Sequence, residues 1–199
     1  MNIEIRKETL EEHKIVENIV RESFWNLYQP GCNEHLILHN FRGKNHYIDE
    51  LSNIILVDGI IVGQIMFSKA ELTNIKNGEK LDIIVFGPVS ILPKYQKQGI
   101  GERLIRDAIS RARDLDYNYI LIFGNPQYYH KFGFKTAQHY GVIIEGQDFL
   151  KELDYVMLLD LQHDGMISQE SGPWLYKNPE GYDVDENELK EFDKNFDKK

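Results

Sequence analysis

Hydrophobic and polar residues alternate at the start of the chain, and the pattern then changes to a helical period. Ile3 and Ile5 alternate with polar neighbours and predict a first strand. Thr9 is followed three residues later by Glu12, which is the spacing of a capping box. We therefore expect a helix to begin near Thr9 and to run to about Trp25.

The next segments predict a short helix followed by an antiparallel hairpin. Residues 34–41 place apolar side chains on one side of a helix. Residues 53–57 and 61–67 are apolar runs typical of strands. Asp58-Gly59 lies between these runs and favours a tight hairpin, because both residue types tolerate positive φ.

The second half of the chain alternates strands with one long helix. Residues 81–92 predict a strand that is interrupted at Gly87-Pro88, because proline cannot donate to a ladder. Residues 119–123 predict a buried central strand, and residues 155–161 predict the last strand. The helix between the first two strands has an apolar face formed by Leu104, Ile105, Ala108, Ile109, Ala112 and Leu115.

The chain is long enough for one well-buried core and short for two. It has 199 residues, of which 42% are hydrophobic. We expect a domain over residues 1–163 and a C-terminal extension over residues 164–199, docked on the same domain. Leu189, Phe192 and Phe196 have helical spacing, so the extension should contain a short helix and end in a frayed, acidic tip.

Charge and composition narrow the class of protein. The formal net charge of −9 argues against broad nucleic-acid binding and mildly favours a cationic partner, although acidity also simply keeps a protein soluble. No apolar run is long enough to cross a membrane, and the N-terminal residues lack the apolar stretch of a signal peptide. The single cysteine, Cys32, agrees with a reducing compartment. We expect a cytoplasmic protein that binds neither nucleic acid nor membrane.

The most informative motif is a glycine-containing loop between a strand and a helix. It reads Gln96-Lys97-Gln98-Gly99-Ile100-Gly101. Glycines let backbone N–H groups approach an anion closely, and a helix N-terminus adds about half a positive charge. A dinucleotide fingerprint is excluded because its third glycine position is Leu104, and a P-loop is excluded because no Gly-Lys-Ser/Thr follows. The loop predicts a pyrophosphate site.

A second motif lies downstream and supports one family. The Q-x-x-G-x-G pattern resembles the acyl-CoA loop of the GNAT superfamily of N-acetyltransferases. The segment Gly124-Asn125-Pro126-Gln127-Tyr128-Tyr129-His130-Lys131-Phe132-Gly133-Phe134 resembles the short helix and Gly-Phe that follow the fifth strand of that family. The resemblance covers nearly the whole chain, and it is closest to a bacterial subfamily described mostly as predicted acetyltransferases.

The resemblance implies a fold and a cofactor. The fold class would be α/β (α+β), a GNAT fold with a mixed central sheet of about six to seven strands, splayed between strands 4 and 5, and flanking helices. Acetyl-CoA would bind with its pyrophosphate on the loop from Gln96 to Gly101. Its pantetheine arm would run along the backbone of Val89, Ser90 and Ile91, as an added strand. Asn125 would contact the pantetheine or a bound water.

The resemblance also implies a general acid. Tyr129 stands four residues before Gly133, which is the position of the family's usual proton donor to the coenzyme A sulfur. The neighbouring Tyr128 and Phe132 leave the register open, because a shift of one residue would exchange a core aromatic for a catalytic one.

The general base is less clear. Glu34 and His35 follow the first helix, where this superfamily commonly forms its acceptor pocket, and either could deprotonate an ammonium group directly or through water. Asp82 is a weaker alternative. His35 and His39 have the spacing of a metal pair but no evident third ligand, so we expect no metal. No base is evident beside Cys32, so direct attack by the amine is favoured over an acyl-enzyme.

These inferences predict an enzyme, an acetyl-CoA-dependent N-acetyltransferase that acts on a primary amine of a small molecule or a peptide. A non-catalytic acyl-CoA sensor or interaction module and a transferase for longer acyl chains remain alternatives. The acceptor and the oligomeric state stay open, with a homodimer among the options.

Overall fold

The computed structural model describes residues 1–148, 150–162 and 165–199, which form two compact units. The expected boundary between residues 163 and 164 lies outside the described residues. Strands β3 (Ile60–Asn74) and β4 (Lys80–Ile91) and helix α3 (Ile100–Asp114) each contribute to both units. The first unit comprises Met1–Phe67, Pro88–Ala108 and Glu180–Lys199, and the second comprises Ser68–Gly87 and Ile109–Pro179.

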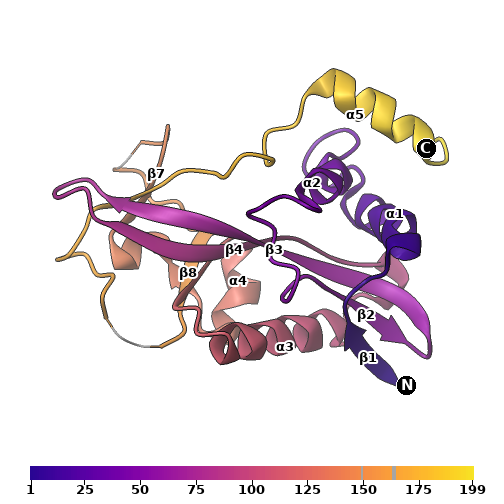
Figure 1. The fold of residues 1–199 in the computed structure, drawn as a ribbon, viewed down its shortest axis with the longest axis horizontal. Coiled ribbons are helices and arrows are strands. Elements are labelled where there is room, and N and C mark those ends of the chain that lie inside the picture. The colour runs from indigo at the N-terminus through magenta and orange to yellow at the C-terminus, as the bar shows by residue number, and fades with distance from the viewer. Residues whose placement is uncertain (149, 163–164) are drawn as a thin grey trace. The chain divides into compact units, whose positions relative to one another are not determined.

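The first unit contains most of the elements that the hydrophobic pattern predicts. In Figure 1, helix α5 lies beside α1 and α2, although it is far from them in the sequence. The 3-10 turns of the first unit cover Leu10–Glu12, Pro93–Tyr95 and Asp193–Asn195. Its remaining elements are β1 (Ile3–Arg6), α1 (His13–Phe24), α2 (Glu34–Phe41), β2 (Asn53–Val57) and α5 (Glu186–Phe192).

The strands of the first unit form the expected antiparallel meander. Strand β1 pairs with β2, and β2 pairs with β3. The hairpin turn is confirmed, because Asp58 and Gly59 both have positive φ, 49° and 81°. Helices α1 and α2 bury apolar side chains together with those of β2 and β3 in one cluster, formed by Val16, Val20, Ile37, Leu38, Phe41, Ile54, Leu56 and Met66.

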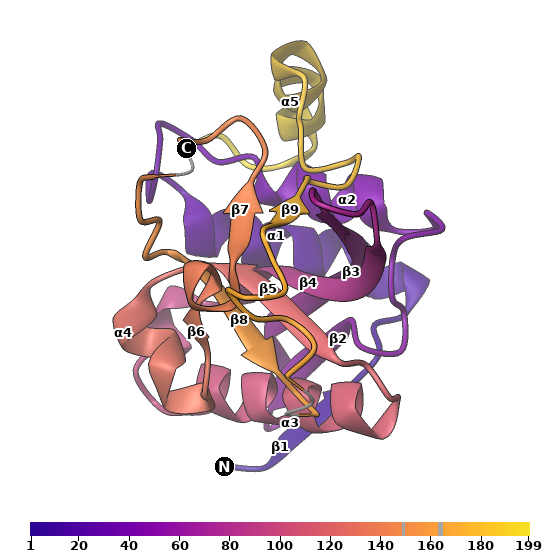
Figure 2. The same ribbon diagram turned by 90° about the vertical axis from the view of Figure 1, so that its left-hand side faces the viewer.

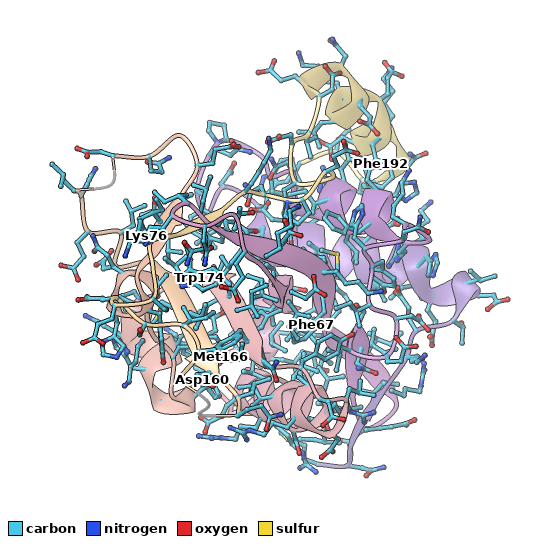
Figure 3. The ribbon with its side chains drawn as sticks, turned by 60° about the vertical axis from the view of Figure 1, so that its left-hand side comes forward. Phe67, Lys76, Asp160, Met166, Trp174 and Phe192 are labelled. Atoms are coloured by element: carbon cyan, nitrogen blue, oxygen red, sulfur yellow. The ribbon has the colours of Figure 1, made fainter. Side chains whose placement is uncertain are left out.

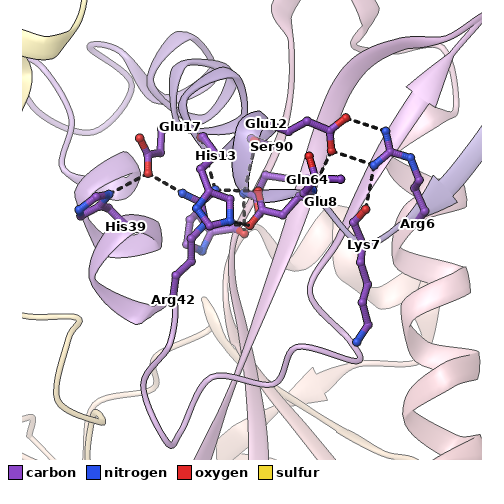
Figure 4. A network of polar contacts seen from close by, with 12 residues as sticks. Arg6, Lys7, Glu8, Glu12, His13, Glu17, His39, Arg42, Gln64 and Ser90 are labelled. Carbon is purple, nitrogen blue, oxygen red and sulfur yellow. Dashed lines mark hydrogen bonds and ion pairs between the residues drawn. The ribbon is translucent and has the colours of Figure 1, made fainter.

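The predicted capping box of Thr9 and Glu12 is confirmed, and it caps the 3-10 turn Leu10–Glu12. The carboxylate of Glu12 accepts a hydrogen bond from the Thr9 backbone N–H at 2.8 Å. The same carboxylate accepts two from Arg6, at 2.8 and 2.7 Å, as Figure 4 shows. The Arg6 hydrogen bonds lower the pKa of Glu12 to about 2. One 3-10 turn separates Thr9 from α1, so the regular helix begins at His13 rather than near Thr9.

The second unit contains the parallel pair of the sheet. Strand β4 pairs in parallel with β5 (Tyr119–Phe123) at Ile84 and Val85, and this ladder ends before Gly87. The strand itself is not interrupted there, because β4 continues through Gly87 and Pro88 to Ile91. All five residues of β5 pair with β8 in the antiparallel sense. A 3-10 turn over Ala137–Tyr140 precedes β7. The further elements are β5 (Tyr119–Phe123), α4 (Pro126–Tyr129), a 3-10 turn at His130–Phe132, β6 (Lys135–Thr136), β7 (Val142–Ile144), β8 (Val156–Asp160) and β9 (Trp174–Tyr176).

The sheet is mixed and agrees with the predicted fold class. Among the described residues the sheet has nine strands, two more than the upper expected number, and the seven strands of its main path have the order β1-β2-β3-β4-β5-β8-β6. Strands β7 and β9 lie off this path and pair in parallel with each other, as Figure 2 shows.

Two strand predictions were wrong. Strand β3 continues to Asn74 instead of ending at Phe67, because its second half pairs with β9, with Leu72 opposite Tyr176. Strand β9 follows β8, so the run at residues 155–161 is not the last strand. Trp174, labelled in Figure 3, is buried on β9 and donates its indole N–H to Ser171 at 3.1 Å. A strand of three residues is too short to show an alternating pattern.

Within the described part of the chain, the helices are all too short or too polar to span a membrane.

Candidate functional site

The predicted phosphate loop is held by its own glutamines. Gln96 donates a side-chain hydrogen bond to the Ile91 carbonyl at 2.9 Å, at the end of β4. Gln98 donates in the same way to the Lys94 carbonyl at 2.9 Å. Both amides therefore fold the loop back on the preceding residues. In this arrangement the two side chains shape the loop, and its backbone is the part that a ligand would contact.

The end of the loop forms an open start for helix α3. Gly99 has φ of 80°, which favours glycine, and its carbonyl accepts the first helical hydrogen bond, from Arg103 N–H at 3.0 Å. The amides of Ile100 and Gly101 come earlier in the first turn, where a helix offers no acceptor. A Cβ built on Gly99 would meet nothing within 4 Å. These amides, the helix dipole and the open space fit a diphosphate.

The end of β4 is packed tightly on β3. Gln64, on β3, donates to the Pro88 carbonyl at 3.0 Å and to the buried Ser90 hydroxyl at 3.4 Å, and Figure 4 shows these two side chains. A Cβ added to Gly63 would lie 2.5 Å from the Ser90 backbone oxygen. The side chain of Ser90 is therefore engaged with β3.

Helix α1 also contacts this end of β4. The Ile91 carbonyl accepts from the Ser23 hydroxyl at 3.0 Å as well as from Gln96. The single proton of the Ser23 hydroxyl also faces the Ile19 carbonyl, at the shorter distance of 2.7 Å, so Gln96 is the donor committed to Ile91. Val89 is partly exposed and precedes the packed residues.

In the second unit, Tyr129 is packed and Tyr128 is exposed. The Tyr129 residue is 8% exposed, and its ring lies 5.8 Å from the rings of Phe86 and Phe134. A Cβ on Gly124 would collide with the Tyr129 ring, so this ring is held against the chain just after β5. Tyr128 is 37% exposed, and the Lys131 ammonium lies 4.3 Å from its ring centre. The two tyrosines thus have different surroundings.

Asn125 caps the short helix that carries both tyrosines. Its side-chain oxygen accepts from the Gln127 backbone N–H at 3.0 Å. Its backbone carbonyl accepts from the N–H groups of Tyr128 and Tyr129. Asn125 therefore orients α4 in the structure, and a contact with pantetheine stays a prediction.

Back in the first unit, Glu34 occupies the first turn of α2. Its carboxylate accepts from the Asn33 backbone N–H at 3.1 Å, and the side chain is partly buried. Burial raises the pKa of Glu34. A carboxylate with a raised pKa is a better proton acceptor than an ordinary one near neutral pH.

The neighbouring His35 differs from Glu34, because none of its surface is exposed. Its Nε2 lies 3.0 Å from a carboxylate oxygen of Asp193, and its Nδ1 lies 3.6 Å from the Cys32 sulfur. Burial lowers the pKa of His35. As placed, His35 is enclosed and does not reach solvent, so it is not arranged to contact an acceptor. Sequence reasoning did not connect it to Asp193, 158 residues away.

Cys32 has the partner base that the sequence does not reveal, but the thiol is not activated. Burial raises the pKa of Cys32 to about 12, so it stays protonated near neutral pH.

Among the residues that the structure describes, no group of three or more His, Cys, Asp or Glu side chains could hold a metal ion. The Nδ1 atom of His39 lies 2.8 Å from a carboxylate oxygen of Glu17, so His39 and His35 have different partners and do not form a metal pair.

A buried ion network that sequence reasoning missed joins α1 to α2. Arg42 donates two hydrogen bonds to Glu8, both at 2.7 Å, and one to Glu17 at 2.5 Å. Figure 4 shows His39 beside Glu17, and His13 lies 3.7 Å from Glu8. Because these side chains come from segments before α1, within α1 and after α2, the network fixes the second helix against the first.

Comparison with known proteins identifies the fold. Residues 49–136 match the family model of the acetyltransferase (GNAT) domain. The chain is 26% identical to the N-acetyltransferase YhbS of Escherichia coli K12 over 83 residues, which cover 42% of this chain and 47% of the relative. It is 31% identical to the N-acetyltransferase YjhQ of the same strain over 87 residues, covering 44% and 47%. The chain thus spans about half the length of the curated relatives it matches.

Solved structures extend the likeness to most of the chain. The crystal structure of E. coli YhbS in complex with CoA has a TM-score of 0.74 and 20% identity, and the match covers 92% of each chain. A GNAT family acetyltransferase from Brucella melitensis in complex with acetyl-CoA has a TM-score of 0.68 and 22% identity, covering 92% of this chain and 99% of that one. At these identities the likeness establishes the fold.

Proposed function

Because this chain belongs to the GNAT acetyltransferases, we propose that it is an N-acetyltransferase that uses acetyl-CoA and acts on a primary amine. The observation that carries the proposal is the loop before α3, where Gly99 in the left-handed region is followed by the open first turn of a helix of 15 residues. Backbone amides from this turn would bind the diphosphate of the cofactor.

The proposal gives different tasks to the two units. Acetyl-CoA, when bound, supplies an acetyl thioester, which is activated toward attack by an amine. In the first unit, the loop from Gln96 to Gly101 binds the diphosphate and the backbone of residues 89–91 binds the pantetheine arm. In the second unit, Tyr129 is the general acid that protonates the departing sulfur, and Asn125 orients its helix.

Glu34 is the general base in this proposal. It takes a proton from the ammonium form of the acceptor, directly or through a water molecule. Its raised pKa and partial exposure support this role, while the enclosed position of His35 makes His35 a supporting group. A carboxylate at the acceptor side also favours a cationic acceptor.

The proposed function is tested with the full chain and a panel of primary amines. The panel contains polyamines, amino sugars, amino acids and a peptide with a free N-terminus. We expect release of free coenzyme A to depend on at least one amine, and mass spectrometry to detect one added acetyl group on that amine. If acetyl-CoA binds but no amine accelerates release, the protein is a non-catalytic acyl-CoA-binding module instead.

Replacing Glu34 by glutamine is expected to lower kcat/KM for the acceptor about tenfold or more, with the acetyl-CoA dissociation constant nearly unchanged. A base must be deprotonated, so the wild-type rate should rise with pH through the raised pKa of Glu34, above the ordinary value of 4.5. This acidic limb should disappear in Glu34→Gln. The exposed Glu11→Gln is the matched control, and an unchanged pH profile in Glu34→Gln would exclude Glu34 as the base.

A further inference from the structure

The carboxylate of Asp193, in the 3-10 turn after α5, joins three segments of the first unit. One of its oxygens lies 2.9 Å from Arg21 Nε on α1 and 3.0 Å from His35 Nε2 on α2. The Arg21 side chain is 4% exposed, and His35 is fully buried. A single, partly exposed carboxylate therefore accepts hydrogen bonds from two buried side chains.

The partners of His35 fix its tautomer. A carboxylate oxygen accepts, so the proton lies on Nε2, and Nδ1 is left without a proton, 3.6 Å from the Cys32 sulfur. The Cys32 sulfur also approaches the Arg21 carbonyl at 3.7 Å. Because burial disfavours the charged forms of His35 and Cys32, the cluster holds one cation and one anion, Arg21 and Asp193.

Aromatic rings close the cluster from the C-terminal side. The rings of Phe192 and Phe196 both lie 5.3 Å from the His35 ring. The Arg21 guanidinium lies 4.2 Å from the Trp25 ring centre and 5.5 Å from that of Phe196. Figure 3 labels Phe192 on α5. The rings cover Arg21 and His35, so the donor ends of the two hydrogen bonds are shielded from water, while the Asp193 side chain remains 29% exposed.

The last residues continue this docking along α1. Arg21 also donates to the Asp197 backbone carbonyl at 3.2 Å, and Lys199 pairs with Glu22 at 2.7 Å. Earlier in the same segment, the Tyr182 ring lies 4.7 Å from the Phe41 ring on α2. The segment from residue 180 to residue 199 is thus attached to α1 and α2 at several points. The Phe196 ring packs against both Arg21 and His35, and the Asp193 carboxylate accepts a hydrogen bond from each of them.

We propose that Asp193 is a positioning residue for the acceptor side of the enzyme. It holds His35, and through the first turn of α2 it fixes the adjacent Glu34. This inference rests on the proposed function, in which Glu34 is the base. Without Asp193, Arg21 keeps a buried charge without this carboxylate and His35 keeps a buried donor without its acceptor, so the C-terminal segment loses one of its attachments and the first turn of α2 loosens.

The test compares Asp193→Ala with two matched variants of the full chain. Asp193→Asn keeps an acceptor oxygen, and Asp197→Ala leaves the backbone carbonyl that Arg21 uses. In Asp193→Ala we expect amide hydrogen exchange at residues 34–38 to speed up about tenfold or more, with exchange in α3 unchanged. We expect kcat/KM for the acceptor to fall about tenfold, and the acetyl-CoA dissociation constant to change less than twofold. Asp193→Asn should lie between Asp193→Ala and wild type, and Asp197→Ala should match wild type.

A double variant separates positioning from general loss of structure. If Asp193 acts through Glu34, adding Asp193→Ala to Glu34→Gln should cost little further acceptor kcat/KM. Additive losses, an equal weakening of acetyl-CoA binding, or unchanged exchange at residues 34–38 would each overturn the inference. The exchange measurement needs no acceptor, so it decides on the Asp193 junction even if the proposed transferase activity fails.

Discussion

Gly101→Glu is expected to raise the acetyl-CoA dissociation constant about a hundredfold or more, the largest loss of binding that we expect from one residue. Gly101 is the second residue of α3, where the open backbone amides should receive a diphosphate. A carboxylate there would take the place of the ligand and repel it with a charge of the same sign. The fold should survive, because an acidic side chain in the first turn interacts favourably with the helix dipole.

Isothermal titration calorimetry measures this effect directly. Gly101→Ala is the matched control, because it adds a side chain without a charge and raises helix propensity. We expect its acetyl-CoA affinity to remain far closer to wild type than that of Gly101→Glu. Circular dichroism checks that both variants fold. Unchanged affinity in a folded Gly101→Glu protein would move the diphosphate site away from this loop.

Tyr129→Phe is expected to lower kcat about a hundredfold, with acetyl-CoA binding nearly intact. The substitution removes only the hydroxyl, so the ring contacts with Phe86 and Phe134 and the close approach to Gly124 all remain. The loss therefore reports on the proton rather than on packing. Single-turnover measurement of acetyl transfer separates this step from product release.

Tyr128→Phe is the internal control for the register of the two tyrosines. Its ring is exposed and stacks with Lys131, so its hydroxyl can be removed with little effect on the fold. We expect nearly full activity in this variant. If Tyr129→Phe were fully active and Tyr128→Phe impaired, the general acid would be Tyr128 and our assignment to Tyr129 would be wrong. If both variants were active, water would supply the proton.

The hydrophobic pattern predicted the bounds of those helices and strands that are determined by the residues of the segment itself. The helix at Glu34–Phe41 and the strands at Asn53–Val57 and Tyr119–Phe123 begin and end as predicted, because their apolar periods and turn residues lie within the segments themselves. The helix after the glycine loop was likewise predicted, because its apolar face from Leu104 to Ala112 has a helical period. The short β9 was missed because its strand conformation depends on pairing with β3 and β7.

The surroundings of the candidate site residues could not be predicted where their contacts come from residues distant in the sequence. His35 resembles an exposed catalytic histidine in the sequence, and only its contact with Asp193 shows that it is enclosed. Arg42 gives no signal that it would join Glu8 and Glu17 in one buried network. Charged side chains usually indicate an exposed surface in a sequence. No periodic pattern shows which of them come together when the chain folds.

The close packing of Gly63 on β3 against the backbone of β4 restricts which sequences this fold can accept. A side chain there would meet a backbone oxygen of β4, which cannot rotate away as a flexible side chain could. Larger residues would force the two strands apart and shift the residues that lead into the phosphate loop. Among natural relatives that share this backbone, we expect glycine at the equivalent position even where the surrounding apolar residues drift. Directed evolution toward new acyl groups should therefore leave Gly63 unchanged and draw its diversity from the residues beyond the crossing.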